Sequence, residues 1–428
     1  MSSGFSIGLS GLRSNSYWLN VIGNNLANLN TTGYKDGVVS FQDMLGSSIN
    51  GGILNANPMQ LGMGSSIAGT SPVFTQGQIQ NTSQATDLAI MGNGFFVVTD
   101  GNRYLYTRAG DFTLDKDGYL KTQQGLFLQG YGATQGVVIP GTLTNIQVTP
   151  GLAYPPKTTS YFMTNLNLNA NDAVYAAGPP ATGGIFSANL DVYDSLGSPH
   201  TLTITYTKTA ANTWQYDVTI PADDVSGATA PVSIGNGSIS FDPATGQLSS
   251  PASTIPPTPV TLTPAVTLNN GANFPTSLNW FMHDTDGTAR ITQFATKSST
   301  ASVSQDGYGS GSLIGIQVET SGLVQGVFSN GQYQTLGQVV LSSFHNPQGL
   351  SKEGQNLYAE TNLSGAHAYG VPGAGGLGTL LGNSLEMSNV DMAEEFTKMI
   401  LGQRGYQANS RVITTSDELI QEALNLKR

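Results

Sequence analysis

Few residues in this chain are of a type that could carry out chemistry. The 428 residues include no cysteine and four histidines, so disulfides, thiolate nucleophiles and cysteine-ligated metals are excluded. A histidine metal site would need several such side chains converging at ligand spacing. All four histidines instead occur in contexts typical of loops: His200, His283, His345 and His367.

Two acidic segments resemble fragments of a calcium-binding loop. They cover residues 283–287 and 115–118. Neither has the acidic residue at the twelfth position that an EF-hand loop requires. Both segments therefore fit ordinary hairpin turns better than a metal site.

No arrangement typical of an enzyme stands out either. The chain has no Gly-x-Ser-x-Gly elbow, and Gly92-Asn93-Gly94 precedes an expected strand, whereas a dinucleotide-binding loop follows one. Nothing selects a glycosidase pair from the 27 acidic residues. We predict that the protein is not an enzyme and has no catalytic residue, no cofactor and no metal.

The charge pattern bears on possible partners. Only 10% of residues are charged and the net charge is −11, against roughly 25% charged residues in ordinary soluble domains. Between Thr122 and Ala289 the only basic residues are Lys157 and Lys208. Because binding to phosphates needs clustered lysine and arginine, we expect no nucleic-acid partner. A polar surface with few charges also allows copies to pack closely.

The N-terminus lacks the basic and apolar regions of a secretory signal peptide. The apolar runs are also far shorter than the roughly 20 residues that cross a bilayer, so we expect no membrane insertion. Taken alone, these two features indicate a cytoplasmic protein.

The N-terminal segment predicts an amphipathic helix over 5–29, because its apolar residues repeat every seven residues with companions three or four residues away. It ends in a cluster of turn-forming residues before Gly33. The apolar residues are Phe5, Leu9, Leu12, Leu19, Ile22, Leu26 and Leu29.

The C-terminal segment mirrors this pattern and predicts a longer helix over 389–424. Ser388 and Asp391 match a capping box, and acidic residues follow in the first turn, where the helix dipole favours them. The heptad series and its companions are Leu385, Met392, Phe396, Met399, Tyr406, Ile413, Ile420 and Leu424.

Neither apolar stripe can bury itself, and a strict seven-residue repeat favours a partner helix. Periodicity alone leaves two alternatives open, a helical hairpin within one chain and a surface for assembly. The residues between the two helices show β patterns, which leaves no helical core for the helices to join. An apolar face outside a β-rich body is typical of an interaction surface.

The middle of the chain is expected to be mainly β. Strands are predicted over 94–99, 103–108, 185–193 and 214–220, and Asn236-Gly237 is predicted as a turn. The pattern indicates nested domains: a helical domain of 1–30 and 385–428, a connecting segment of 31–70, a first β-domain of 71–160 and 295–384, and an inserted outer β-domain of 161–294.

Aromatic residues in the insert allow two interpretations. Core packing on alternating strand positions is favoured over an exposed platform for carbohydrate: Tyr193, Tyr206, Trp214, Tyr216 and Trp280.

Longer motifs at both ends carry a resemblance. The stretch from Asn24 to Lys35 resembles the signature of bacterial flagellar rod and hook axial proteins, and 388–417 resembles their shared C-terminal segment. Residues 94–98 and 106–112 match the first β-domain of this family, and 191–197 resembles the outer domain of its hook members. The signature residues are Asn24, Asn25, Asn28, Asn30, Thr31, Gly33 and Tyr34.

The resemblance implies a structural subunit with a coiled-coil-like inner domain of paired helices. It implies self-assembly into a curved tube that acts as a universal joint and transmits torque from rod to filament. Implied partners are copies of the chain, the distal rod protein, the hook cap protein, the hook–filament junction protein and the flagellar type III export apparatus. The implied location is the extracellular flagellar hook, reached without a cleaved signal peptide. The alternatives are a distal rod-type protein and a secreted β-rich carbohydrate-binding module.

Overall fold

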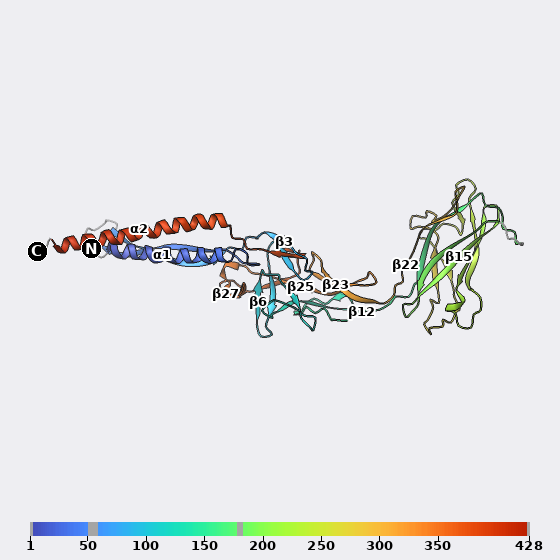
Figure 1. The fold of residues 1–428 in the computed structure, drawn as a ribbon, viewed down its shortest axis with the longest axis horizontal. Helices are drawn as coiled ribbons and strands as arrows, with labels where there is room; N and C mark the ends of the chain where they lie inside the picture. Colours follow the sequence, from blue (N-terminus) through green and yellow to red (C-terminus); the bar gives the residue numbers. More distant parts are fainter. Residues whose placement is uncertain (1–2, 50–58, 178–182, 426–428) are drawn as a thin grey trace. The chain divides into compact units, whose positions relative to one another are not determined.

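The computed structural model describes residues 3–49, 59–177 and 183–425 and divides the chain into two compact units. The first unit comprises residues 1–150, 314–327 and 333–428, and the second comprises 151–313 and 328–332. The chain is mainly β with one helix near each end (Figure 1). This confirms the predicted fold class.

The second unit contains two five-stranded sheets. One has the order β14-β15-β16-β17-β18, and in the other β19-β20-β13-β21 is joined by β22, which pairs with β13. The strands of these sheets are β13 (Tyr161–Asn169), β14 (Ile185–Tyr193), β15 (Pro199–Ala210), β16 (Thr213–Ile220), β17 (Val232–Phe241), β18 (Leu248–Ser250), β19 (Val260–Leu262), β20 (Leu278–Phe281), β21 (Ile291–Phe294) and β22 (Ser299–Gln305). The short β12 (Ala153–Tyr154) belongs to neither sheet and pairs with β23 (Gly311–Val318).

Aromatic side chains form the core of the second unit. Trp280 stacks on Phe162 with ring centroids 5.3 Å apart and donates a hydrogen bond of 3.1 Å to Thr164. Tyr206, Trp214, Tyr216 and Trp280 are all buried in this core, and Tyr193 is half-buried. This burial supports the packing interpretation and removes the platform on which the carbohydrate alternative depended.

The second unit extends beyond the insert expected over 161–294. Its later boundary includes β22, because β22 pairs antiparallel with β13 from Phe162↔Gln305 onward. The predicted turn at Asn236-Gly237 is wrong, since both residues lie inside β17 and pair with β16. A Cβ on Gly237 would lie 2.5 Å from the Tyr216 hydroxyl, so this glycine admits a neighbouring ring.

The β part of the first unit is built on one large sheet in which β25-β9-β5-β6-β28-β27 are neighbours. Its aromatic core includes Phe95, Tyr106 and Tyr358. The strands are β3 (Ile79–Asn81), β4 (Leu88–Met91), β5 (Phe95–Thr99), β6 (Tyr104–Thr107), β7 (Thr113–Leu114), β8 (Leu120–Lys121), β9 (Phe127–Thr134), β10 (Val137–Val138), β11 (Thr144–Asn145), β24 (Leu323–Phe328), β25 (Tyr333–Val339), β26 (Leu341–Ser343), β27 (Ser351–Gly354), β28 (Leu357–Ala359), β29 (Ala368–Gly370), β30 (Thr379–Gly382) and β31 (Ser384–Glu386), with β23 (Gly311–Val318) at the boundary of the two units.

The two helices, α1 (Ser3–Ala27) and α2 (Met392–Asn425), run antiparallel as a pair in the first unit (Figure 1). Asp391, not Ser388, caps α2, because its carboxylate accepts hydrogen bonds of 2.7 and 3.1 Å from the N–H groups of Ala393 and Glu394. The capping box predicted at Ser388 is therefore wrong, and the N-cap of α2 lies three residues later. The Ser388 hydroxyl accepts from the Val390 N–H instead.

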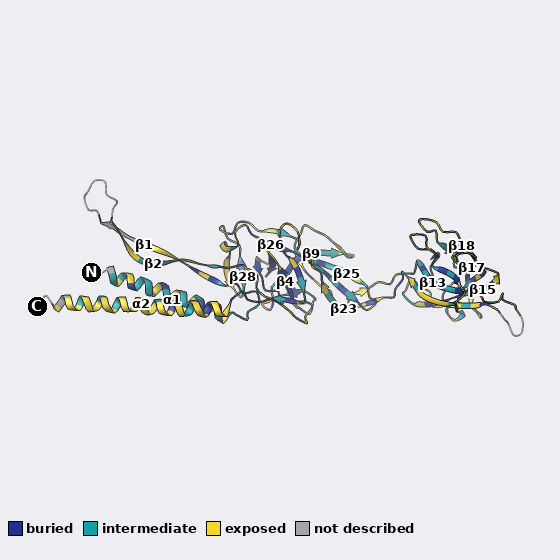
Figure 2. Ribbon diagram, turned by 90° about the horizontal axis from the view of Figure 1, so that it is seen from above, coloured by how far each residue is buried: buried dark blue, intermediate teal, exposed yellow. Residues whose placement is uncertain are grey.

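A long hairpin follows α1 where a connecting segment was expected over 31–70. It consists of β1 (Gly37–Ile49) and β2 (Met59–Pro72), paired from Gly37↔Pro72 outward. The hairpin lies beside α1 (Figure 2). Ser14 donates to the Ser65 carbonyl at 3.2 Å, and the Tyr17 and Thr70 hydroxyls are 3.1 Å apart.

Candidate functional site: the helix pair and its polar joint

Glycines and small polar residues form the contact between α1 and α2. A Cβ on Gly8 would lie 2.8 Å from the Ile413 side chain, and one on Gly11 would lie 2.7 Å from Asn409. A Cβ on Gly402 would lie 2.9 Å from Leu19. The absence of side chains at these positions lets the two backbones approach closely.

The predicted apolar stripe of α1 lies at the edge of this contact, and its member Leu19 reaches Gly402 of α2. Positions 5, 12, 19 and 26 each follow by one residue the seven-residue series 4, 11, 18 and 25 that faces α2. Ile22 is buried and Phe5 is exposed. The other stripe residues are half-buried: Leu9, Leu12, Leu19, Leu26 and Leu29.

The stripe of α2 also lies at the edge of the contact, and its member Ile413 reaches Gly8 of α1. Residues 395, 402, 409 and 416 face α1 at seven-residue spacing, and the stripe is offset from them around the helix. Met392 and Phe396 are each 50% exposed, and Tyr406 is exposed. Met399, Ile413 and Ile420 are half-buried, whereas the Leu424 side chain lies outside the described residues.

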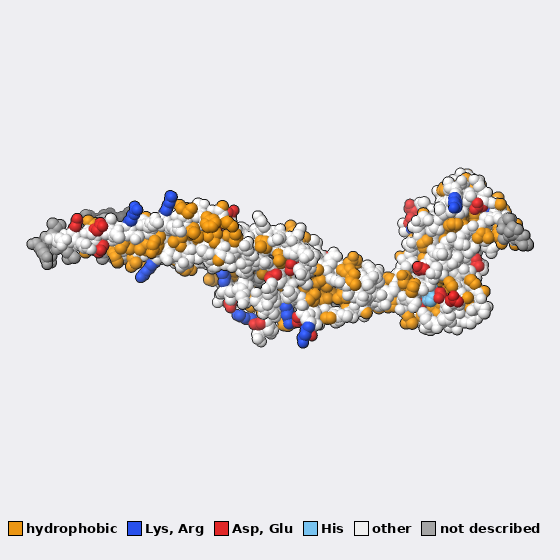
Figure 3. All heavy atoms as spheres, in the orientation of Figure 1, with side chains coloured by type: hydrophobic (Ala, Val, Ile, Leu, Met, Phe, Trp, Pro, Cys, Tyr) orange, Lys and Arg blue, Asp and Glu red, His pale blue; other side chains and the backbone are white. Residues whose placement is uncertain are grey.

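The two stripes meet on one side of the helix pair. In an antiparallel pair, residues offset in the same sense from the contact on both helices fall on one side. Figure 3 shows hydrophobic side chains gathered along the helix pair, and Figure 2 shows α2 largely exposed. We call this surface the apolar face; it is formed by Phe5, Leu9, Leu12, Leu19, Leu26, Met392, Phe396, Met399 and Tyr406.

At the base of the helices, Asn25 of α1 joins three chain segments through its amide: α1, residues 34–37 and α2. The Asn25 Nδ2 donates to Asp36, to the Gly37 carbonyl at 3.0 Å and to Glu395 of α2 at 3.1 Å. Its Oδ1 accepts from the Gly37 N–H at 3.1 Å and from the Tyr34 hydroxyl at 3.0 Å. We call Asn25, Tyr34, Asp36 and Glu395 the polar joint.

Other signature residues shape the loop that leads to this joint. Asn28 donates to Asn24 at 2.7 Å and accepts from Thr31 at 3.1 Å. Gly33 has a φ of 68°, and a Cβ there would lie 2.4 Å from the Ala109 nitrogen, so glycine is required. Asn30 is exposed at the tip.

A buried ion cluster of Lys35, Arg108 and Glu386 lies next to the joint. Lys35 and Arg108 contact the two carboxylate oxygens of Glu386 at 2.6 and 3.3 Å. The side chains of Lys35 and Glu386 are fully buried. Burial lowers the pKa of Lys35 and of Arg108, and the Glu386 carboxylate opposes both shifts. The cluster connects the signature loop, the β-sheet and the strand before α2.

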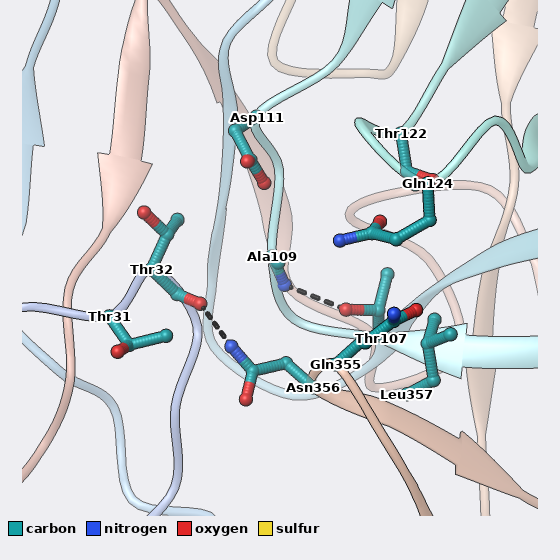
Figure 4. A pocket seen from close by; sticks show the side chains of 10 residues that line it. All are labelled: Thr31, Thr32, Thr107, Ala109, Asp111, Thr122, Gln124, Gln355, Asn356 and Leu357. Carbon is teal, nitrogen blue, oxygen red and sulfur yellow. Dashed lines mark hydrogen bonds between the residues drawn. The ribbon is translucent and has the colours of Figure 1, made fainter. Parts of the chain in front are cut away.

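A small polar pocket lies on the other side of the signature loop (Figure 4). Its volume is about 270 Å³. Asn356 donates to the Thr32 carbonyl at 2.8 Å, which fastens the loop to the β27–β28 turn. Asp111 is the one ionisable residue in the lining, and burial raises its pKa. The lining therefore offers no acid–base pair.

The two calcium-loop-like segments and His200 have ordinary structural roles. Asp115 accepts hydrogen bonds from the Asp117 and Tyr119 N–H groups, and Asp284 closes its turn with Gly287, as expected for hairpin turns. The loop expected at His200 is wrong, since this residue is buried in β15. Among the described residues no group of three histidine or acidic side chains could hold a metal.

None of the described helices is both long and apolar enough to span a bilayer.

The polar joint should make stability depend on pH. Burial raises the pKa of Asp36 above its ordinary value and the nearby Glu395 adds to the rise, whereas Lys398 opposes it. The folded state then binds the proton more tightly than the unfolded state, so stability falls as pH rises through the range above 3.8. We expect Asp36→Asn to reduce this slope and to stabilise the first unit at pH 7, because a neutral amide is not repelled by Glu395. The gain should be only about 0.5–1 kcal/mol, because solvent screens the interaction between Asp36 and Glu395.

Calorimetric melting of the monomer at pH 4 and pH 7 measures this effect. Asp43→Asn, on the exposed part of the hairpin, is the matched control. If the melting temperatures of the wild type and of Asp36→Asn change with pH in the same way, the predicted repulsion between Asp36 and Glu395 is wrong.

Sequence comparisons match four family models along the chain. They are described as flagella basal body rod protein (residues 5–35), flagellar hook protein FlgE/F/G D1 domain (89–151), flagellar basal body protein FlaE D2 domain (165–308) and flagellar basal body rod FlgEFG protein C-terminal (381–426). The first and last contain α1 with the signature loop and α2. The polar joint thus lies within or next to the matched segments.

Two relatives that match this chain over nearly its full length are both named flagellar hook protein FlgE. Flagellar hook protein FlgE of Borreliella burgdorferi is 36% identical, with 98% of both chains covered. That of Escherichia coli is 34% identical, covering 99% of this chain and 100% of the relative. The crystal structure of Helicobacter pylori flagellar hook protein FlgE2 shares the fold, with a TM-score of 0.50, 16% identity, and coverage of 72% of this chain and all of that one. The chain belongs to the flagellar hook protein family.

Proposed function

We propose that this chain polymerises with copies of itself through the apolar face of its helix pair. As a member of the hook family it is a structural subunit of the flagellar hook. The observation that carries the proposal is the continuous, partly exposed apolar face, in which Met392 and Phe396 remain half exposed in the single chain. Monomeric proteins rarely leave such extended apolar surface uncovered.

The polymer would serve as the curved, torque-transmitting joint between rod and filament. Membership of the family supports the distal rod protein, the hook cap protein and the hook–filament junction protein as further partners. It also supports export through the flagellar type III apparatus to an extracellular position in the hook. The assembly residues proposed for α2 extend along the heptad to Ile413, Ile420 and Leu424.

Removal of α2 tests the proposal. Deleting residues 392–428 should leave a folded, soluble protein that forms no tubes, while the full chain forms tubes visible by electron microscopy. The deletion must begin after Glu386, because a cut at residue 385 would leave Lys35 and Arg108 buried without their anion. Tubes formed by the 392–428 deletion would overturn the proposed role of the helices.

A further inference from the structure

A second apolar surface lies between α1 and the hairpin and shares Leu9 with the apolar face. It is a groove of about 550 Å³ whose apolar lining comes from both elements: Leu9, Tyr17, Met44, Met63 and Ile67. Arg13 and several serines complete the lining. None of the described side chains of α2 lines the groove, because α2 contacts α1 through Gly8 and Gly11 on another side.

Arg13 gives the groove a basic rim. It is the only charged residue of α1, and it is exposed. Within the described part of the chain it makes no ion pair, since every short cation–carboxylate contact found there involves other residues. A partner for this groove should therefore be apolar and carry negative charge beside its apolar contact.

The last turns of α2 have this character. Leu419 is 64% exposed, the highest value among the large apolar side chains of the two helices that the structure describes. Asp417, Glu418 and Glu422 surround it and are exposed. None of these acids pairs with a lysine or arginine among the described residues. The last turns of α2 thus present an exposed leucine flanked by exposed carboxylates.

A helical polymer needs two different, complementary surfaces on every subunit, because its contacts are heterologous. The apolar face alone, meeting itself, would close a symmetric pair. We propose that the α1–hairpin groove receives the Leu419 segment of a second copy, with Arg13 facing its acidic side chains. This inference rests on the proposed self-assembly and names one of its contacts.

Cysteine cross-linking tests the contact directly, because the natural chain contains no cysteine. One preparation carries Met63→Cys and another carries Leu419→Cys, and the two are polymerised together and oxidised. A disulfide between the two preparations can form only between copies. We expect a heterodimer on a non-reducing gel from polymer but not from unpolymerised mixture.

Thr397→Cys, at an exposed position near the start of α2, replaces Leu419→Cys in the matched control and should give at least tenfold less heterodimer. Equal cross-linking from both positions, or none from Leu419→Cys in well-formed tubes, would overturn the groove assignment while leaving self-assembly intact. Failure of the unmodified chain to polymerise would instead count against the proposed function itself.

A charge exchange gives an independent readout. Arg13→Glu should raise the critical concentration for polymerisation at least tenfold. Adding Glu418→Arg and Glu422→Arg should lower it again, reversing at least half of the increase in its logarithm. Arg404→Glu, at an exposed site on α2, controls for net charge. An unchanged critical concentration in Arg13→Glu would contradict the proposal.

Discussion

Replacing Leu12 and Leu19 together with aspartate is expected to abolish polymerisation while the melting of both β-rich units stays almost unchanged. Both side chains belong to the apolar face and are half-buried in the single chain. Assembly would enclose the new carboxylates in an apolar contact, at a cost of several kcal/mol for each unpaired charge. A cost of about 3 kcal/mol already corresponds to more than a hundredfold loss of affinity.

Sedimentation and electron microscopy measure assembly, and calorimetry measures the two units. Because Leu19 also lies against Gly402, Phe396→Asp provides a second variant that is half exposed before assembly. Asn20→Asp, at an exposed site on α1 outside the stripe, is the control and should polymerise normally. Normal tubes from both apolar variants would show that the face does not carry the assembly.

Replacing Glu386 with glutamine is expected to destabilise the first unit by about 3–5 kcal/mol. The change leaves Lys35 and Arg108 buried without an anion, and breaking one partner of a buried pair has a cost of this size. The second unit should melt as before, because it contains none of these residues. Two calorimetric transitions would separate the effects.

Glu353→Gln is the matched control, because Glu353 pairs with the exposed Arg103 at 3.3 Å. A surface pair of this kind contributes less than about 1 kcal/mol. If Glu386→Gln melts like Glu353→Gln, the buried cluster does not stabilise the unit. Adding Lys35→Met to Glu386→Gln should recover part of the loss, since one buried cation is removed.

The periodic features of the chain were predictable from sequence. The apolar repeats located both helices to within a few residues, and the strand over 185–193 agrees with β14. These elements are long and strongly patterned, which is where sequence reasoning is most reliable. The signature motif also directed attention to Asn25, whose amide proves to be the centre of the polar joint.

The helix contact, the hairpin and the ion cluster produce no periodic pattern in the sequence. The close approach of the helices depends on Gly8, Gly11 and Gly402, which give no hydrophobic signal, so periodicity identified only the stripes at the edge of the contact. The hairpin strand β2 is rich in glycine and serine and lacks regular alternation, and its pairing depends on β1 and α1. The ion cluster joins residues separated by up to 351 positions, and only the folded chain brings Lys35 to Glu386.

The glycines at the helix contact also bear on how easily the ends of the chain lose their structure. The two helices contain Gly4, Gly8, Gly11, Gly23, Gly402 and Gly405, and each interior glycine lowers helix stability by about 1 kcal/mol relative to alanine. Because the face that includes Met392 and Phe396 is half exposed in the single chain, we expect the isolated pair to unfold at a lower temperature than the β-rich units. We propose that ends which unfold in this way would let the chain pass through a narrow export channel and regain its helices where it is deposited.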